Sequence, residues 1–200
     1  MRNRIVFVAF SLLIFITSTC FASEASERNI ALIQKSCGNG LRNSMSVFSV
    51  EDIKLLQDST GCNIIVPNGR DKLLLAKRIA KSTGRDIMNR RPYSELANND
   101  LKVMATALKA YMLVLITAKY VNSHAAFLGN DGKVHSYGCT GEVESIFYYV
   151  KDETKDLKVF ATNQGYSSPK DVLEELKPQV LSAFQQRITN YCQSLADKLQ

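Results

Sequence analysis

The stretch that decides the fold is residues 99–120, NDLKVMATALKAYMLVLITAKY. Its apolar part carries a single charge, Lys109, and Asn98, Asn99 and Asp100 precede it as capping residues. A segment that is apolar nearly all round is typical of a helix in the centre of an α-helical domain. The charge in its middle and its short apolar run argue against a membrane span. The stretch therefore predicts one buried core helix.

Two amphipathic segments flank this predicted helix. Residues 71–83 have helical periodicity and end before Gly84, a common helix stop. The apolar side predicted for this helix comprises Leu73, Leu75, Ala76, Ile79 and Ala80. Near the C-terminus, Ser168 and Pro169 predict a helix start, and Pro178 predicts a break or restart. The apolar stripe beyond Pro178 comprises Leu181, Phe184, Ile188, Cys192, Leu195 and Leu199.

The remaining segments predict short elements. Residues 29–35 suggest a short helix, and Ser49 suggests the N-cap of another that runs through Gln57 and stops near Gly61. Short strands are expected at residues 62–66, 126–128, 133–135, 145–151 and 157–162, with 143–149 also compatible with a helix. The fold class expected is α+β and mainly α, a single helical domain over residues 28–200 with a small antiparallel β element at about residues 126–162.

The N-terminus predicts export. Arg2 and Arg4 precede the apolar residues 5–16, and small residues at Cys20 and Ala22 fit a cleavage site, the pattern of a signal peptide over residues 1–22. Residues 23–27 are expected to be a frayed mature terminus. Lipidation of Cys20 is the alternative, but the preceding Thr-Ser-Thr fits that pattern poorly. The sequence contains no Asn-x-Ser/Thr acceptor, which tilts the localisation toward a bacterial periplasmic or secreted protein.

Cysteine usage agrees with export. Without the signal peptide the chain retains four cysteines, Cys37, Cys62, Cys139 and Cys192, and an oxidising compartment predicts two disulfides among them. Three pairings are possible. Proximity in the sequence favours Cys37–Cys62, which leaves Cys139–Cys192.

The charge distribution is the strongest functional signal. The chain has 25 basic and 19 acidic residues, so loss of Arg2 and Arg4 leaves 23 basic residues and a net charge of +4. Residues 70–91 alone contain eight basic and two acidic residues, a net +6. The binding residues predicted here are Arg70, Lys77, Arg78, Lys81, Arg85, Arg90 and Arg91. Such a patch attracts an anionic protein or an envelope surface, although many charge runs are only a solvated helix face.

Signals for catalysis are weak. His135 lies four residues before Cys139, and Glu142 with Glu144 forms a possible carboxylate pair. The sequence contains no HExxH, CxxC, EF-hand, GxSxG or glycine-rich phosphate motif, so no metal or cofactor is expected.

The leading hypothesis is therefore an exported, non-enzymatic binding protein: an envelope component, or an inhibitor or immunity-type factor that engages an anionic partner. Nucleic acid is disfavoured as a ligand, because export removes the protein from cytosolic DNA and RNA and few aromatic residues interleave the basic ones. The first alternative is a secreted hydrolase with His135 as base. The second is a protein that associates with membrane surfaces through residues 71–83, without a transmembrane span after signal cleavage.

Overall fold

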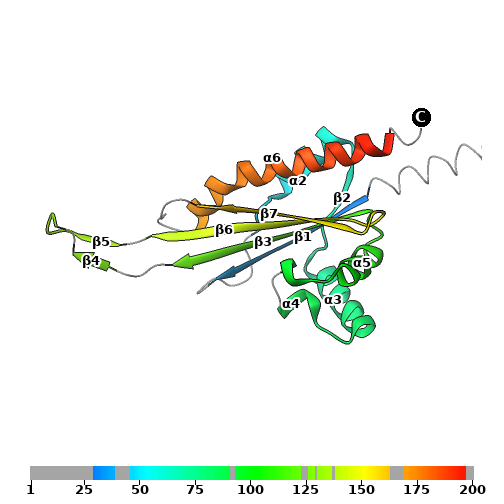
Figure 1. Ribbon diagram of the computed structural model, residues 1–200, viewed down its shortest axis with the longest axis horizontal. Helices are drawn as coiled ribbons and strands as arrows, with labels where there is room; N and C mark the ends of the chain where they lie inside the picture. The colour runs from blue at the N-terminus through cyan, green and yellow to red at the C-terminus, as the bar shows by residue number, and fades with distance from the viewer. Residues whose placement is uncertain are drawn as a thin grey trace, which may run out of the picture.

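Five strands form a mixed sheet through the middle of the molecule, and helices cover both of its faces (Figure 1). The computed structural model describes residues 29–38, 46–90, 93–122, 126–128, 130–136, 138–162 and 169–196. The predicted signal peptide, Cys20 and residues 23–27 lie outside these ranges. Within them, none of the helices combines the length and apolar character that a bilayer crossing needs.

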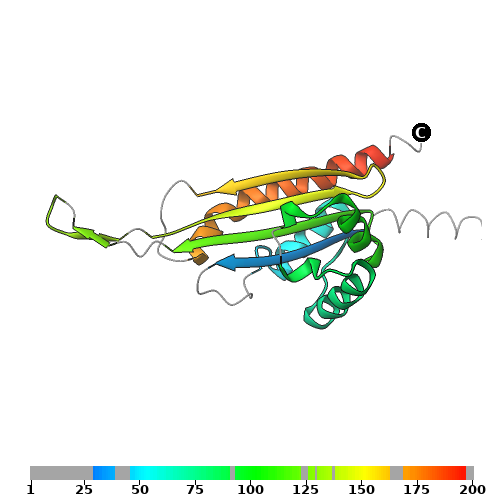
Figure 2. The same ribbon diagram turned by 60° about the horizontal axis from the view of Figure 1, so that its bottom comes forward.

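The strand order of the sheet is β2-β1-β3-β6-β7 (Figure 2). The central β3 pairs in parallel with β1 and antiparallel with β6, while β2 and β7 form the edges. The strands are β1 (Asn29–Gly38), β2 (Asn63–Ile65), β3 (Met112–Asn122), β6 (Cys139–Tyr149) and β7 (Thr154–Ala161). The prediction of a helical domain with a small β element at 126–162 is wrong, because three of these five strands lie outside that range.

The predicted core helix over residues 99–120 is two elements. Helix α5 spans Asn98–Ala107, with Ala97 as its N-cap residue, and β3 begins at Met112. Lys109 makes the turn between them in the left-handed conformation, with φ of 52°. Residues 112–118 are buried on both faces of the sheet, so residues 112–116 are apolar at every position and show no alternation. Hydrophobic periodicity does not separate such a strand from a buried helix.

Burial on both faces also explains why the helix predicted at residues 29–35 is wrong. The predicted helix at residues 29–35 is strand β1, in which Ile30, Ala31, Leu32 and Ile33 are all buried. Even-numbered positions face one hydrophobic cluster and odd-numbered positions face the other. A strand with two buried faces is again apolar without a period of two.

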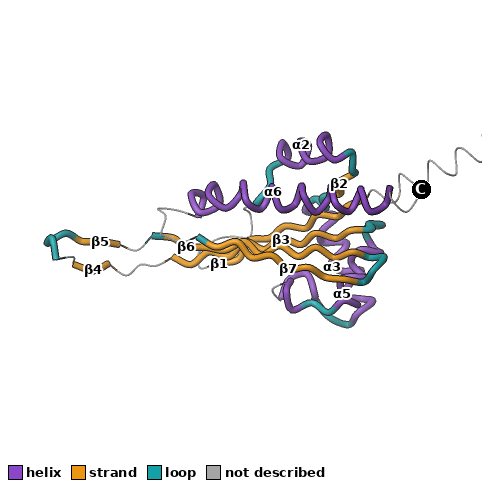
Figure 3. Tube along the Cα trace, turned by 45° about the horizontal axis from the view of Figure 1, so that its top comes forward, coloured by secondary structure: helices purple, strands orange, loops and turns teal. Residues whose placement is uncertain are grey.

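One face of the sheet is covered by α2 (Val50–Thr60) and α6 (Pro169–Ala196), as Figure 3 shows. Ser49 is the N-cap of α2 in a capping box, and Gly61 ends the helix, both as predicted. Phe184 of α6 stacks on Phe48 with ring centroids 5.5 Å apart and also contacts Phe147 of β6. Helix α6 continues through Pro178 without the predicted break.

The other face is covered by the segment between β2 and β3. This segment contains α3 (Gly69–Thr83), α4 (Ile87–Arg90), the short 3₁₀ helix η1 (Tyr93–Glu95) and α5. Its apolar side chains pack on the odd-numbered residues of β1 and β3. A separate antiparallel hairpin, β4 (Ala126–Leu128) and β5 (Val134–Ser136), extends beyond the end of the sheet in Figure 1 and confirms the hairpin predicted there.

The predicted disulfide framework is not found among the described cysteines. Cys62 and Cys192 lie with their Sγ atoms 2.7 Å apart, and no disulfide joins them. Cys139, the first residue of β6, is a buried free thiol that donates to the carbonyl of Thr140, so the predicted Cys139–Cys192 disulfide is wrong. The side chain of Cys37 is not among those that the structure describes. The pairing that sequence proximity favoured is wrong, because α6 brings Cys192 next to Cys62 instead.

The turn at Lys109 generates a stability prediction. Lys109→Gly is expected to raise the free energy of unfolding by up to about 1 kcal/mol, because glycine adopts a positive φ without the steric cost of a side chain. Lys109→Ala retains that cost and should change little. Urea unfolding followed by circular dichroism measures both. A decrease of about 1 kcal/mol for the glycine variant would instead fit an uninterrupted helix across residues 99–120.

Candidate functional site

Helix α3 carries most of the predicted binding residues. Its N-cap is Asn68, whose side chain accepts hydrogen bonds from the backbone N–H groups of Arg70 and Asp71, and Gly84 ends it with φ of 68°. Leu75 and Ile79 anchor the helix to the cluster beneath it. The helix predicted over residues 71–83 is confirmed, with a start two residues earlier.

The outer side of α3 is basic and exposed to solvent. We call Arg70, Lys77, Arg78 and Lys81 the cationic face. All four are exposed, and none of their side chains forms an ion pair within the described part of the chain. These positions recur at the spacing of one helical face, so their charges point into the same region of solvent.

Two leucines of α3 are also exposed. Leu73 is 56% and Leu74 is 54% exposed to solvent. The prediction that Leu73 lies on the buried side of the helix is wrong, because the sheet packs against Leu75, Ala76 and Ile79 instead. The cationic face is therefore bordered by aliphatic side chains, a combination that a purely solvated helix does not need.

Other cations of the basic segment have internal roles. Lys72 donates its Nζ proton to the carbonyl of Gln34 at 2.9 Å, and burial lowers the pKa of this lysine. Arg85 binds Asp100 with an Nη2–Oδ1 distance of 2.6 Å. The side chain of Arg90 and the whole of Arg91 lie outside the described residues. The structure thus brings four of the seven predicted binding residues onto one face and assigns Arg85 to an ion pair.

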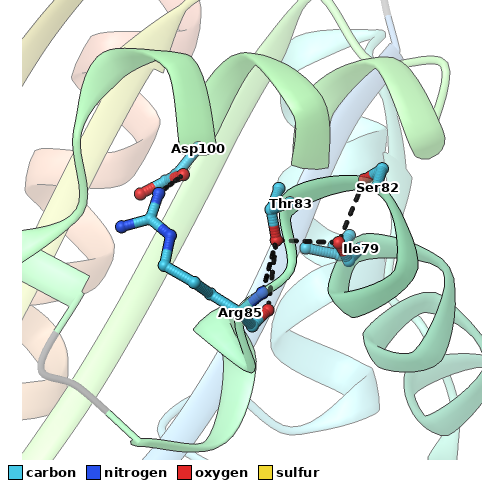
Figure 4. Close-up of polar contacts among 5 residues, drawn as sticks. All are labelled: Ile79, Ser82, Thr83, Arg85 and Asp100. Carbon is cyan, nitrogen blue, oxygen red and sulfur yellow. Dashed lines mark hydrogen bonds and ion pairs between the residues drawn. The ribbon is translucent and has the colours of Figure 1, made fainter.

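The Arg85–Asp100 ion pair joins the end of α3 to the first turn of α5 (Figure 4). The Asp100 side chain is only 4% exposed, and its position near the helix N-terminus favours a negative charge. Thr83 supports the turn that carries Arg85, since its hydroxyl donates to the carbonyl of Ile79 at 2.8 Å and accepts from the Arg85 N–H (Figure 4). The two helices are held in a defined arrangement as a result.

A groove of about 460 Å³ lies between these two helices. The residues that line it are Arg78, Ile79, Ser82, Asn99, Lys102, Val103, Thr106 and Ala107. Sequence reasoning missed the five residues from α5 because it placed them in a wholly buried helix. A signal was present: Asn99, Lys102 and Thr106 are polar at spacings of three and four residues, which marks one exposed helical side.

The candidate carboxylate pair is bound by a single ammonium group. Lys119 donates to Glu142 at 2.8 Å and to Glu144 at 3.0 Å, and the backbone N–H of Ser94 donates to Glu144. Burial favours the neutral form of Glu144, but the hydrogen bonds and charge of Lys119 together with Ser94 outweigh it, so the pKa of Glu144 lies below its usual value. An ionised, ion-paired Glu144 is poorly suited to act as a general acid near neutral pH.

The hypothesis that His135 acts as a base depends on a side chain that the structure does not describe. The His135 backbone pairs with Phe127 in the β4–β5 hairpin, but its side chain and all of His124 are not described. The thiol of Cys139, its candidate partner, is buried, which raises its pKa and makes it a poor nucleophile. Among the described residues, no group of three or more His, Cys, Asp or Glu could hold a metal ion.

No family model matches the sequence, and no curated protein matches it either. Comparison with solved structures finds several bacterial proteins of low similarity. The C-terminal domain of LpoB from Salmonella enterica is 10% identical with a TM-score of 0.38, over 69% of this chain and 84% of that one. A lipoprotein from Neisseria meningitidis is 10% identical with a TM-score of 0.34, over 81% and 98% of the two chains. The PelC dodecamer from Paraburkholderia phytofirmans is 11% identical with a TM-score of 0.33, over 80% and 89%. Similarity at this level assigns the chain to no family.

The environment of Glu144 predicts a pH-dependent contribution to stability. Because its pKa is lower in the folded than in the unfolded chain, ionised Glu144 stabilises the fold above the unfolded pKa of about 4.3, and this contribution is lost as the pH falls through the folded value. Glu144→Gln should therefore lower the free energy of unfolding by about 1–2 kcal/mol at pH 7 and by less near pH 3, because the contribution is lost as the pH falls through the folded pKa. Urea unfolding at both pH values measures the difference.

The matched control is Glu142→Gln, which removes the more exposed carboxylate from the same lysine. Its effect at pH 7 should stay within about 0.5 kcal/mol because solvent screens the pair. An equal loss for the Glu144 variant at both pH values would contradict the ion-pair explanation.

Proposed function

We propose that this protein is an exported, non-enzymatic binding protein that engages an anionic partner through the cationic face of α3. The observation that carries the proposal is the presence of four exposed cations on one helical face without an ion pair in the described part of the chain. A fold stabilises itself by pairing or dispersing charge, and Lys72 and Arg85 in the same segment have such partners. The concentrated charge on α3 remains available to an external anion.

The rigid support of α3 favours recognition over simple solvation. Caps at both ends, the buried Leu75 and Ile79, and the link from Arg85 to α5 hold the cations in a fixed arrangement. Because the helix backbone is already fixed, the ordering cost of docking falls mainly on the exposed side chains themselves. Exposed charges mainly accelerate association and set its specificity, so the complex is expected to weaken as salt increases.

Export is the second component of the proposal and comes from residues 1–22. The basic start, the short apolar run and the small residues near Ala22 predict a signal peptide. A periplasmic or secreted location offers acidic proteins and an anionic envelope surface as partners. It also disfavours nucleic acid, in agreement with a cationic face that contains no aromatic residue.

Charge-removing variants test this function. The α3 variant replaces all four residues of the cationic face with Gln, and the control replaces Lys54, Lys133, Lys151 and Lys158, four exposed lysines elsewhere. Both lose four positive charges. We expect cross-linking in envelope extract at low salt to retain a partner on the wild type and the control, with at least about tenfold less on the α3 variant. Equal retention on the two variants, or no partner at low salt, would contradict the proposal.

The exposed leucines support a second candidate, reversible association with an anionic membrane surface. Leu73 and Leu74 lie beside the cationic face, and each cation near an anionic bilayer contributes about 1 kcal/mol. Flotation with vesicles of phosphatidylglycerol and phosphatidylcholine tests this directly. We expect binding only to vesicles that contain the anionic lipid, with loss in both the α3 charge variant and Leu73→Ser/Leu74→Ser. Binding that ignores lipid charge would exclude this candidate.

A further inference from the structure

We propose that the groove between α3 and α5 binds a long-chain carboxylate, with its alkyl chain on the floor and its carboxylate at Arg78. This goes beyond the macromolecular partner of the cationic face, because the groove faces α5 and has the size of a small-ligand site. Its volume of about 460 Å³ falls within the range of pockets that hold one small organic molecule.

The floor of the groove is apolar. Ile79 is buried, while Val103 and Ala107 are partly buried and pack against the cluster beneath the two helices. These side chains leave aliphatic surface facing the groove, and an alkyl chain that covers it removes apolar area from water. A small hydrophilic anion would gain nothing from such a floor.

The charge around the groove selects an anion. The charged residues that line it are Arg78 and Lys102, both cationic, and no acidic residue is among the lining side chains. Lys102 is already paired with Glu153, which raises the pKa of the lysine and keeps it charged. Arg78 has no ion pair within the described residues, so its guanidinium is the available group.

The chemistry of arginine suits a carboxylate. A guanidinium offers parallel N–H donors that match the two oxygens of a carboxylate in a bidentate pair. The Asn99 amide and the Thr106 hydroxyl add polar groups at the groove wall. Ser82 uses its hydroxyl proton on the carbonyl of Ile79 at 3.0 Å, so it is not a donor to the ligand (Figure 4).

The two exposed leucines of α3 lie at different angles from Arg78 around the helix. Leu73 lies five residues before Arg78, which places it about 140° away around the helix at 100° per residue. Leu74 lies four residues before Arg78 and only about 40° away, so a membrane that contacts Leu74 also comes near Arg78. A single alkyl chain with one anionic end fits the combination of apolar floor and cationic rim.

Isothermal titration with decanoate, below its micelle concentration, tests the proposal. We expect decanoate to bind, decylammonium to bind at least about tenfold more weakly because of the cationic rim, and acetate not to bind because it lacks the chain. Equal binding of decanoate and decylammonium, or decanoate binding only above its micelle concentration, would overturn it.

Two variants separate the charge from the floor. Arg78→Gln should weaken decanoate binding at least about tenfold, whereas Lys54→Gln, with the same charge loss on the opposite side of the sheet, should change it less than twofold. Ala107→Leu fills the floor while retaining a strong helix former, and should abolish binding with Arg78 intact. Circular dichroism confirms that each variant is folded.

Unchanged binding in Arg78→Gln or in Ala107→Leu would overturn the proposal. Its failure is distinguishable from failure of the proposed function. If decanoate does not bind while the α3 charge variant still loses its envelope partner, the groove inference is wrong and the macromolecular function stands. If decanoate binds and no envelope partner is retained at low salt, the groove inference stands and the proposed macromolecular function is wrong.

Discussion

The double burial of β3 is the constraint on which the rest of the structure depends. Residues 112–120 of β3 pair with β1 on one side and with β6 on the other, and both rows of side chains are covered over residues 112–118. Each face then needs its own layer of helices, α2 with α6 on one side and the α3–α5 segment on the other. The helix before β3 must also stop, which Lys109 achieves, and that stop leaves α5 lying beside α3. The groove and the cationic face exist because the sheet divides the molecule in this way.

Packing gives the basic residues between Arg70 and Arg91 different roles. Lys72 reaches back to the carbonyl of Gln34 in β1, and Arg85 neutralises a nearly buried aspartate at the start of α5. These contacts hold α3 against the sheet and against α5. The four residues of the cationic face point away from those contacts and form no ion pair within the described part of the chain. Lys72 lies in α3 and Arg85 follows its end, so these two partnered cations hold in place the helix that carries the cationic face.

Much of the helical structure outside the core could be predicted because local rules decide it. Ser49, Gly61 and Gly84 act as caps whatever the rest of the chain does, and α3 has one polar and one apolar side. The strands β1 and β3 could not be predicted by the same rules, since a strand with two buried faces looks like a buried helix in sequence. The candidate site follows the same division. The cations of α3 could be predicted from the sequence, whereas the groove residues of α5 could not, because residues 99–120 were predicted to form one buried helix.

The sequence by itself determined the basic segment, both caps of α2, the end of α3, the hairpin turn and a signal-like N-terminus, because each depends on neighbouring residues. The cap predicted at residues 98–100 is wrong, because Ala97 is the N-cap residue of α5. Only the tertiary structure decided which cations remain exposed, which thiols meet and which carboxylates share a lysine. Those outcomes depend on contacts between residues far apart in the chain, such as Cys62 with Cys192 and Glu144 with Ser94. The physical reason is that charge and apolarity are properties of a residue, whereas pairing and exposure are properties of the packed fold.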